Sequence, residues 1–556
     1  MMTSKRSFDL ILALLLIAST LVYAWRYVDF QVPPFEDAAM LMRYAQNLAG
    51  GDGIVWNIGE PPVDGATDFL FMVASAVFIK LGFTVGQAVR GLGFASHLAT
   101  VLLVYFVNRR IHKASVSLSI FSGLYLAVGT GLAYVAAYFG TPFFALAAAS
   151  TWTFGLLLIQ PVRPERTLSH DEVAVEGSRF GLSLAFALSG LITGLIRPEV
   201  VILASLMLVS LIVIRGWKKS ISTIVIFASV FLLLGGAYFI WHWNYFGYPL
   251  PNPFYKKGGG GLHWDSFNNS LLNTLRLCAP FLIAFILGFR SRETTKQTIA
   301  YLIPVIGFAA SFVLISDEMN YGARFQYALL PIAAMSWIPL LRGFNFSWPQ
   351  QLQRRERSVY LFAAISIAAG VIYYSWFQNC FLASYQQTCF TPYVADGRYE
   401  MGKILSEYRG KDYVIATTEA GLLPYYSGWG AIDTWGLNDQ FIAHNGGLTA
   451  EYLERYKPHV IMFHDYYSPL VPPKLTEANL AQPWFRMTIT MKEYAEANGY
   501  VLAAVFGDSP YDTHYYYVRP DFQDSERIIE QISKMKRYYW FTTGKKAINY
   551  AGYPEP

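Results

Sequence analysis

Charged side chains are scarce in this sequence: Asp, Glu, Lys and Arg make up only 15% of its 556 residues. A soluble domain carries about 25%. Hydrophobic residues account for 54%, a balance that excludes a disordered chain and argues against an ordinary cytosolic enzyme. The net charge of +5 is modest and needs no nucleic-acid partner to explain it. The composition therefore indicates a membrane protein with room for one additional domain.

Cysteine is almost absent, with three residues in the whole chain. Cys278 lies inside a hydrophobic run, where a small buried apolar residue is the simplest interpretation. Cys380 and Cys389 follow the last hydrophobic run. An oxidising compartment would permit a disulfide between them, and two free thiols are the alternative. No cysteine spacing indicates a zinc site.

Long hydrophobic runs, by contrast, are abundant. A membrane-spanning helix needs about 20 mostly apolar residues, and about eleven runs satisfy this requirement. The sequence therefore predicts a polytopic α-helical membrane domain over 1–377. The predicted spans are 8–25, 88–107, 115–133, 141–159, 181–196, 199–214, 220–242, 272–289, 299–315, 326–341 and 358–377.

The basic residues give these spans an orientation. Lys and Arg clusters precede the first span and follow the second, sixth, eighth and tenth, so they share one side, which is predicted to be cytoplasmic. Counting the short segment 69–82 as a span would break this agreement, so we expect an interfacial or re-entrant helix within 69–87. The N-terminal run also resembles a signal peptide that would be cleaved after Val22-Tyr23-Ala24, and this alternative leaves the later topology unchanged.

Three segments on the predicted outer side are too long or too polar to be simple connections: 26–68, 243–271 and the tail 378–556. The tail alternates between strand-like and helix-like patterns, which predicts an extracytoplasmic α/β domain. The strands are expected near 412–417, 430–434, 459–464, 500–506 and 514–518, and the helices near 397–408, 447–456, 486–498 and 523–537.

The first outer loop carries a pair of acids, Glu36 and Asp37, at the start of a predicted amphipathic helix that runs to about Ala49. Two interpretations are open: the acids favour a helix N-terminus because of its dipole, with Glu36 paired to Arg43, or they act in catalysis. One apolar stripe follows the helix, as expected for a helix lying on a membrane surface. Its members are Met40, Leu41, Tyr44 and Leu48.

Several cations run against the positive-inside pattern because they lie on the outer side. Arg197 belongs to Arg-Pro-Glu. This tripeptide either ends one helix and begins the next, with a cation at one helix end and an acid at the next start, or it forms an anion site. Lys256 and Lys257 precede a glycine run, and Arg324 lies at a span start, where a cation is unfavourable for the helix dipole. These residues come from different loops but share one membrane depth, an arrangement that would suit a lipid-linked phosphate.

At these residues the sequence resembles the GT-C membrane glycosyltransferases, and most closely the bacterial, mycobacterial-type arabinofuranosyltransferase branch. The resemblance covers most of the chain in order. It rests on Glu36-Asp37, 43–49, 53–57, 59–60, 63–67, Arg197-Pro198-Glu199, 251–256, Arg324-Phe325, and in the tail on 421–426 and 432–439.

The resemblance implies an inverting transferase in the bacterial plasma membrane. It would move a sugar, with arabinofuranose as the best candidate, from a polyprenyl phosphate to a hydroxyl of a glycan, lipid or surface-protein acceptor. The resemblance implies an acid of the first outer loop as general base. Glu36 matches the family's first acid, where Asp is commoner, and Asp37 matches the second and is the residue that we expect to act as the base. We expect the donor phosphate at Arg197, Lys256, Lys257, Arg324 and Arg43, and other substrate contacts at Asp64, Thr67, Glu199, Asn252, Tyr255 and Tyr321.

Two features of the sequence leave alternatives open. Many relatives place another acid in the second outer loop, but residues 134–142 contain none, so no cofactor is identified and a divalent metal is not favoured. One alternative function is a secondary transporter. A transporter would carry polar groups near the membrane midplane, whereas the charges here gather at one surface. The other alternative is a non-catalytic envelope-assembly or binding protein whose functional part is the tail.

Overall fold

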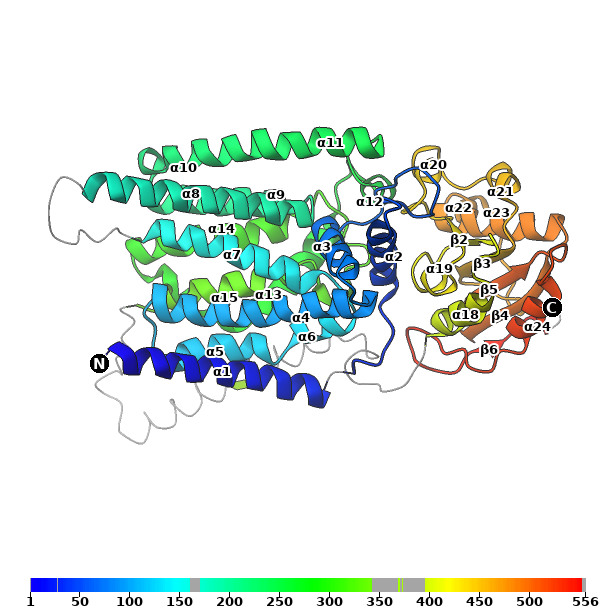
Figure 1. Cartoon of the computed structure of the whole chain (residues 1–556), viewed down its shortest axis with the longest axis horizontal. Helices are drawn as coiled ribbons and strands as arrows, with labels where there is room; N and C mark the ends of the chain where they lie inside the picture. The colour runs from blue at the N-terminus through cyan, green and yellow to red at the C-terminus, as the bar shows by residue number, and fades with distance from the viewer. Residues whose placement is uncertain are drawn as a thin grey trace.

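The computed structural model describes residues 2–27, 29–160, 171–342 and 396–552, together with Ala369, Gly370 and Tyr373. Figure 1 shows long helices side by side in a bundle, with a sheet-containing domain at one end and the N-terminus at the opposite end. The expected disulfide between Cys380 and Cys389, and most of the predicted span 358–377, lie outside the described residues.

Helices occupy the first ten of the predicted spans. Seven described helical runs are long and apolar enough to cross a membrane. They are α1 (Met2–Tyr27), α4 (Val85–Phe106), α5 (Val116–Ala127) with α6 (Thr130–Ala136), α7 (Thr141–Ile159), α8 (Asp171–Ile196), α10 (Trp217–Val230) with α11 (Gly236–Phe246), and α13 (Trp264–Leu287). The other three positions hold α9 (Val200–Arg215), α14 (Arg292–Ser311) and α15 (Leu329–Leu340).

Hydrogen bonds between side chains join helices in the interior of the bundle, where no water competes for the polar groups. Trp152 Nε1 on α7 donates to Ser336 Oγ on α15 (2.9 Å). Trp337 Nε1 on α15 donates to Ser122 Oγ on α5 (3.0 Å). These bonds fix α15, which is buried along its whole length, between its neighbours.

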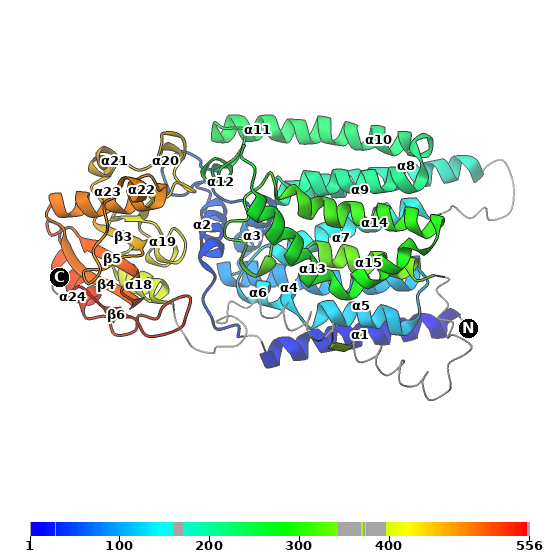
Figure 2. The ribbon, with the colours of Figure 1, turned by 180° about the vertical axis from the view of Figure 1, so that it is seen from behind.

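Two short helices from the first outer loop, α2 (Glu36–Gly50) and α3 (Phe69–Lys80), lie at the end of the bundle that faces the sheet domain (Figures 1 and 2). The predicted bounds of α2 are confirmed, and Gly51, at φ +97°, ends it in the left-handed conformation that favours glycine. The helix within 69–82 has 12 residues, too few to span a bilayer. Its interfacial placement stays a prediction.

The apolar stripe of α2 does not lie on a membrane surface as predicted. Leu41 and Tyr44 are buried in a core shared with α3 and the sheet domain. Met40 and Leu48 pack against the same core. The prediction was wrong because the tail domain supplies the apolar partner that the sequence pattern assigned to lipid.

The tail domain contains a six-stranded mixed sheet of order β2-β1-β3-β5-β4-β6, in which β1 pairs parallel with β2 and β3 and the remaining pairs are antiparallel. Five strands match the predicted ones and β6 was missed. Their bounds are β1 (Val414–Thr417), β2 (Gly430–Asp433), β3 (Val460–Asp465), β4 (Val501–Ser509), β5 (Asp512–Val518) and β6 (Ile548–Asn549).

Four helices of this domain match predicted ones, and three short helices were not predicted. The matches are α18 (Gly397–Leu405), α21 (Ala450–Tyr456), α23 (Pro483–Ala497) and α24 (Ser525–Ser533). The additional helices are α19 (Leu422–Ser427), α20 (Gln440–His444) and α22 (Glu477–Leu480). The fold class, a polytopic helical membrane protein with a C-terminal α/β domain, is confirmed.

Alternate residues of each strand point to opposite faces of the sheet, which separates two cores. Ile415 and Met462 pack on one face with α18, α19, α24 and helix α2. Ala416 and Phe463 pack on the other face with α20, α21 and α23. Because the first core includes α2, the sheet domain is docked directly on the loop that carries Glu36 and Asp37.

Candidate active site

The centre of the candidate site is an ion pair between Asp37 in the first turn of α2 and Arg324, which follows the turn η4 (Tyr321–Ala323). Arg324 Nη2 donates to Asp37 Oδ2, and the guanidinium lies 4.2 Å from the centroid of the Phe139 ring. Arg324 Nε is buried and has no hydrogen-bond partner among the described residues. The pair therefore keeps one strong donor for an incoming anion.

The backbone is strained on both sides of this contact. Ala323, immediately before Arg324, has φ +60°, and Tyr138, immediately before Phe139, has φ +64°. A non-glycine residue in this region costs about 1–3 kcal/mol and persists only where the surrounding structure holds it. The strain therefore marks the Asp37–Arg324 contact as a position that the fold maintains.

Lys257 follows the short helix α12 (Asn252–Lys256) and lies close to this pair. Burial lowers the pKa of Lys257, Asp37 and Glu318 counteract this, and Arg324 and Arg197 add to it. Its Nζ donates to the carbonyl of Glu318 at 3.3 Å, which leaves further protons for an anion. Lys257 and Arg324 thus form a two-cation group beside Asp37.

Arg197 lies in the connection between α8 and α9 and pairs with two acids. Its Nε donates to Glu199 Oε1 at 2.6 Å, and its Nη1 donates to Asp68 Oδ1 at 3.0 Å. The guanidinium also lies 4.4 Å from the centroid of the Phe325 ring. Arg197 therefore holds the wall of the site, and its charge is balanced by two acids before any ligand arrives.

Two cavities meet at Asp37. The first, of about 390 Å³, is lined by six predicted site residues. The second, of about 770 Å³, lies towards the sheet domain. Asp37 and Glu318 line both cavities. The predicted residues of the first are Asp37, Thr67, Arg197, Glu199, Lys257 and Arg324, and those of the second are Glu36, Asp37 and Tyr321.

Arg43, predicted to bind phosphate, lies outside the lining of both cavities. It is buried and donates to the carbonyls of Pro424 and Trp429 in the sheet domain at 2.8 and 2.9 Å. It also donates to the carbonyl of Trp56 at 2.8 Å. Its side chain therefore joins α2 to the sheet domain, a role that sequence spacing did not indicate.

Four further predicted residues surround the site without lining either cavity. Asp64 pairs with His242 Nε2 at 2.7 Å. Asn252 Oδ1 lies 3.3 Å from His444 Nε2, and Tyr255 packs edge-on against the same imidazole ring. Lys256 lies over Trp435 at 4.5 Å. The structure thus separates the two neighbouring lysines, and only Lys257 reaches the first cavity.

Glu36 occupies a different environment from Asp37. It accepts hydrogen bonds from the backbone N–H groups of Gly421 and Leu422 and pairs with Arg398 Nη1 at 3.5 Å. Burial raises the pKa of Glu36 to about 8, although Arg398 opposes the shift. The suggested pair with Arg43 does not form. No signal in the sequence connected Glu36 with Arg398, which lies in the other domain.

The surroundings of Asp37 do not fit a divalent metal. The second outer loop contributes Tyr138, Phe139 and Gly140 to the first cavity, and none of them is a metal ligand. Within the described part of the chain, no group of three metal-ligating side chains includes Asp37. Its charged neighbours, Arg324 and Lys257, would repel a cation.

Two solved membrane proteins are similar to nearly the whole chain. ArnT from Cupriavidus metallidurans, bound to undecaprenyl phosphate, has 12% sequence identity and a TM-score of 0.53, covering 90% of this chain and 97% of its own. The apo oligosaccharyltransferase of Archaeoglobus fulgidus has 12% identity and a TM-score of 0.50, covering 93% of this chain and 75% of its own. The chain has the GT-C fold.

The other comparisons add little to this fold. Residues 386–521 match a family model described as a domain of unknown function, DUF8728. No curated protein sequence matches the chain. The GT-C part of the predicted resemblance is therefore confirmed at the level of fold, and the arabinofuranosyltransferase branch stays a prediction.

Proposed function

We propose that the chain is an inverting glycosyltransferase that moves a sugar from a polyprenyl phosphate to an acceptor hydroxyl on the extracytoplasmic face of the membrane. The observation that carries the proposal is that Asp37, which is bonded to Arg324, lines both cavities. The GT-C fold supports it, as does the undecaprenyl phosphate bound by the similar ArnT.

The donor would occupy the first cavity. Its phosphate meets Lys257 and the free Nε of Arg324, and its prenyl chain follows apolar lining such as Ile202 and Phe312 towards the bundle. Both cations are in position before negative charge develops on the leaving phosphate, and such preorganised charge is often the largest contribution to catalysis.

The acceptor would enter through the second cavity, where Tyr466, Trp484 and Phe541 offer aromatic surfaces. When the phosphate takes Arg324 as its partner, Asp37 becomes free to accept the proton of the acceptor hydroxyl. The acceptor oxygen then forms a bond to the anomeric carbon while the bond from that carbon to the phosphate oxygen breaks. One displacement inverts the configuration at that carbon.

The sugar that the resemblance indicates is arabinofuranose, and the acceptor is a glycan, a lipid or a surface protein. The test is to incubate the purified protein in detergent with synthetic prenyl-phosphate arabinofuranose and other prenyl-phosphate sugars, and to measure release of prenyl phosphate. We expect Asp37→Asn to lose activity by about 10²–10⁴-fold. Asp52→Asn, an exposed carboxylate at the other end of α2, is the matched control.

The assay has outcomes that contradict the proposal. If Asp37→Asn releases prenyl phosphate at the rate of the unmodified protein, Asp37 is not the base. If no prenyl-phosphate sugar is consumed with any acceptor class, the transferase assignment is wrong. Substrate flux by the same protein in liposomes would then favour the transporter class.

A further inference from the structure

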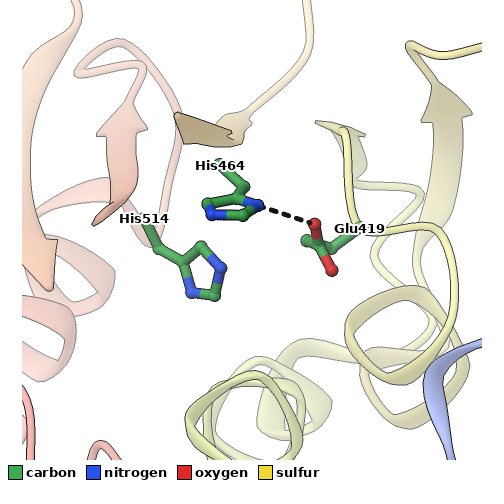
Figure 3. Close-up of side chains that lie close together, drawn as sticks. All are labelled: Glu419, His464 and His514. Atoms are coloured by element: carbon green, nitrogen blue, oxygen red, sulfur yellow. Dashed lines mark ion pairs between the residues drawn. The ribbon is translucent and has the colours of Figure 1, made fainter. Parts of the chain in front are cut away.

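We propose that the sheet domain binds one divalent transition-metal ion of the Zn²⁺ class through Glu419, His464 and His514. Each residue offers one ligand atom, and these three atoms lie within 4.8 Å of one another. Figure 3 shows the three side chains pointing towards a common space, from β3, β5 and the segment after β1. The cluster is separate from the Asp37–Arg324 pair.

His464 is oriented as a metal ligand. Its Nε2 is 2.6 Å from Asp512 Oδ1, and a carboxylate can only accept, so Nε2 carries the proton. Its Nδ1 lies 3.8 Å from Glu419 Oε1, and in the neutral ring this nitrogen would present its lone pair to the site. A carboxylate on the remote nitrogen is the usual partner of a metal-bound histidine.

In His514, too, one ring nitrogen contacts a neighbouring side chain while the other faces the site. Its Nδ1 is 2.6 Å from the hydroxyl of Tyr538, which is itself 2.9 Å from the hydroxyl of Tyr516. Its Nε2 is buried and has no hydrogen-bond partner among the described residues. The unpaired nitrogen is therefore ready for a cation.

The local charge also favours a cation of charge +2. Arg398 pairs with Asp396 and with Glu419 Oε2, which leaves Glu419 Oε1 for the site. Asp512, which lies 2.6 Å from His464 Nε2, adds a third carboxylate. Three carboxylates against one guanidinium leave a net negative surrounding.

The donor set selects the class of ion. Two imidazoles and one carboxylate suit Zn²⁺, whereas Mg²⁺ and Ca²⁺ prefer oxygen ligands alone. Ligand atoms about 2.0–2.2 Å from Zn²⁺ in a tetrahedron are about 3.3–3.6 Å apart, so side-chain shifts of about 1 Å would close the site. Glu419 and His464 line the second cavity, so a bound ion would be accessible from the proposed acceptor side.

The test is metal binding by the full-length protein in detergent after chelator treatment. We expect one equivalent of Zn²⁺ per chain by elemental mass spectrometry. Co²⁺ should give the visible absorption of a low-symmetry site. Glu419→Gln and His514→Gln should weaken binding by about 100-fold or more, and Asp512→Asn by about 10–100-fold. His444→Gln, which removes another imidazole of the domain, should bind as the unmodified protein does.

The unmodified protein alone can also overturn the proposal. Zn²⁺ but not Mg²⁺ should raise its thermal midpoint, and an unchanged midpoint together with substoichiometric Zn²⁺ excludes the site. Binding of Zn²⁺ by Glu419→Gln and His514→Gln at full affinity excludes these ligands. None of these measurements uses a sugar donor, so their outcome is independent of the transferase proposal.

Discussion

At the residue scale, Arg324 has two tasks in the proposed mechanism: it holds Asp37 before the donor binds and holds the phosphate afterwards. Arg324→Gln should therefore lower kcat/KM for the donor by about 10²–10³-fold, the loss typical when one preorganised donor to a developing charge is removed. Steady-state kinetics with varied donor concentration measures it. An unchanged kcat/KM would contradict the phosphate contact.

Arg197 is predicted to behave differently because its guanidinium already pairs with Asp68 and Glu199. Arg197→Gln leaves two partly buried carboxylates without their cation, and breaking a buried pair costs about 3–5 kcal/mol. We therefore expect Arg197→Gln to lower the thermal midpoint, so that any loss of activity reflects lost stability. A variant that melts normally but loses donor binding would instead make Arg197 a phosphate ligand.

Glu36 gives a pH-dependent prediction. Its pKa is raised from 4.5 to about 8 by burial, so the folded protein binds a proton there more tightly than the unfolded chain does. This contribution to stability is complete below about pH 4.5 and is lost as the pH rises through about 8. The thermal midpoint should fall between pH 5 and 8, and Glu36→Gln should flatten that fall. Identical pH profiles for both proteins would show that Glu36 does not titrate in this range.

For the acids and cations of the site, the sequence predicted a common membrane depth but not the direction of each side chain. Asp37, Lys257 and Arg324 meet at one cavity, as their common depth suggested. Lys256 and Arg43, at the same depth, face elsewhere. Depth follows from hydrophobic runs, whereas the direction of a side chain depends on contacts between distant segments, which one sequence does not reveal.

At the scale of elements, the contact between α2 and α19 depends on a residue without a side chain. A Cβ atom on Gly421 would lie 1.9 Å from the backbone carbonyl oxygen of Glu36, which is far closer than van der Waals contact allows. Gly421→Ala should lower the stability by about 2 kcal/mol or more, measured as the midpoint of thermal unfolding.

The control for this prediction is Gly91→Ala in α4, where nothing lies within 4 Å of an added Cβ atom. Alanine is the better helix former, so this variant should unfold at the same temperature or higher. A Gly421→Ala protein as stable as Gly91→Ala would mean that α2 and α19 are not in contact.

Element length decided which parts of the tail could be predicted. The five strands of four residues or more were predicted, whereas β6, which was missed, has two residues. Helices α20 and α22, with five and four residues, are too short to show a helical period. The helix α2 was found by its period, but its partner was not, because an apolar stripe does not specify which apolar surface covers it.

At the scale of the whole molecule, the bundle and the sheet domain meet at Asp37, with one cavity on each side of it. If the first cavity takes the lipid donor and the second the acceptor, changes in each should affect one substrate. Ile202→Trp narrows the first cavity and should raise KM for the donor about tenfold, the effect of roughly 1.4 kcal/mol, without changing KM for the acceptor. Tyr466→Ala removes an exposed aromatic surface from the second cavity. It should raise KM for the acceptor without changing KM for the donor.

Both variants lie away from the Asp37–Arg324 contact, so kcat at saturating substrate should stay near that of the unmodified protein. The measurement is a two-substrate kinetic matrix for each variant. If each change raises KM for both substrates equally, the two cavities belong to a single substrate path. If Ile202→Trp affects only the acceptor, the sides are reversed, and the phosphate contacts proposed for Lys257 and Arg324 would have to be abandoned.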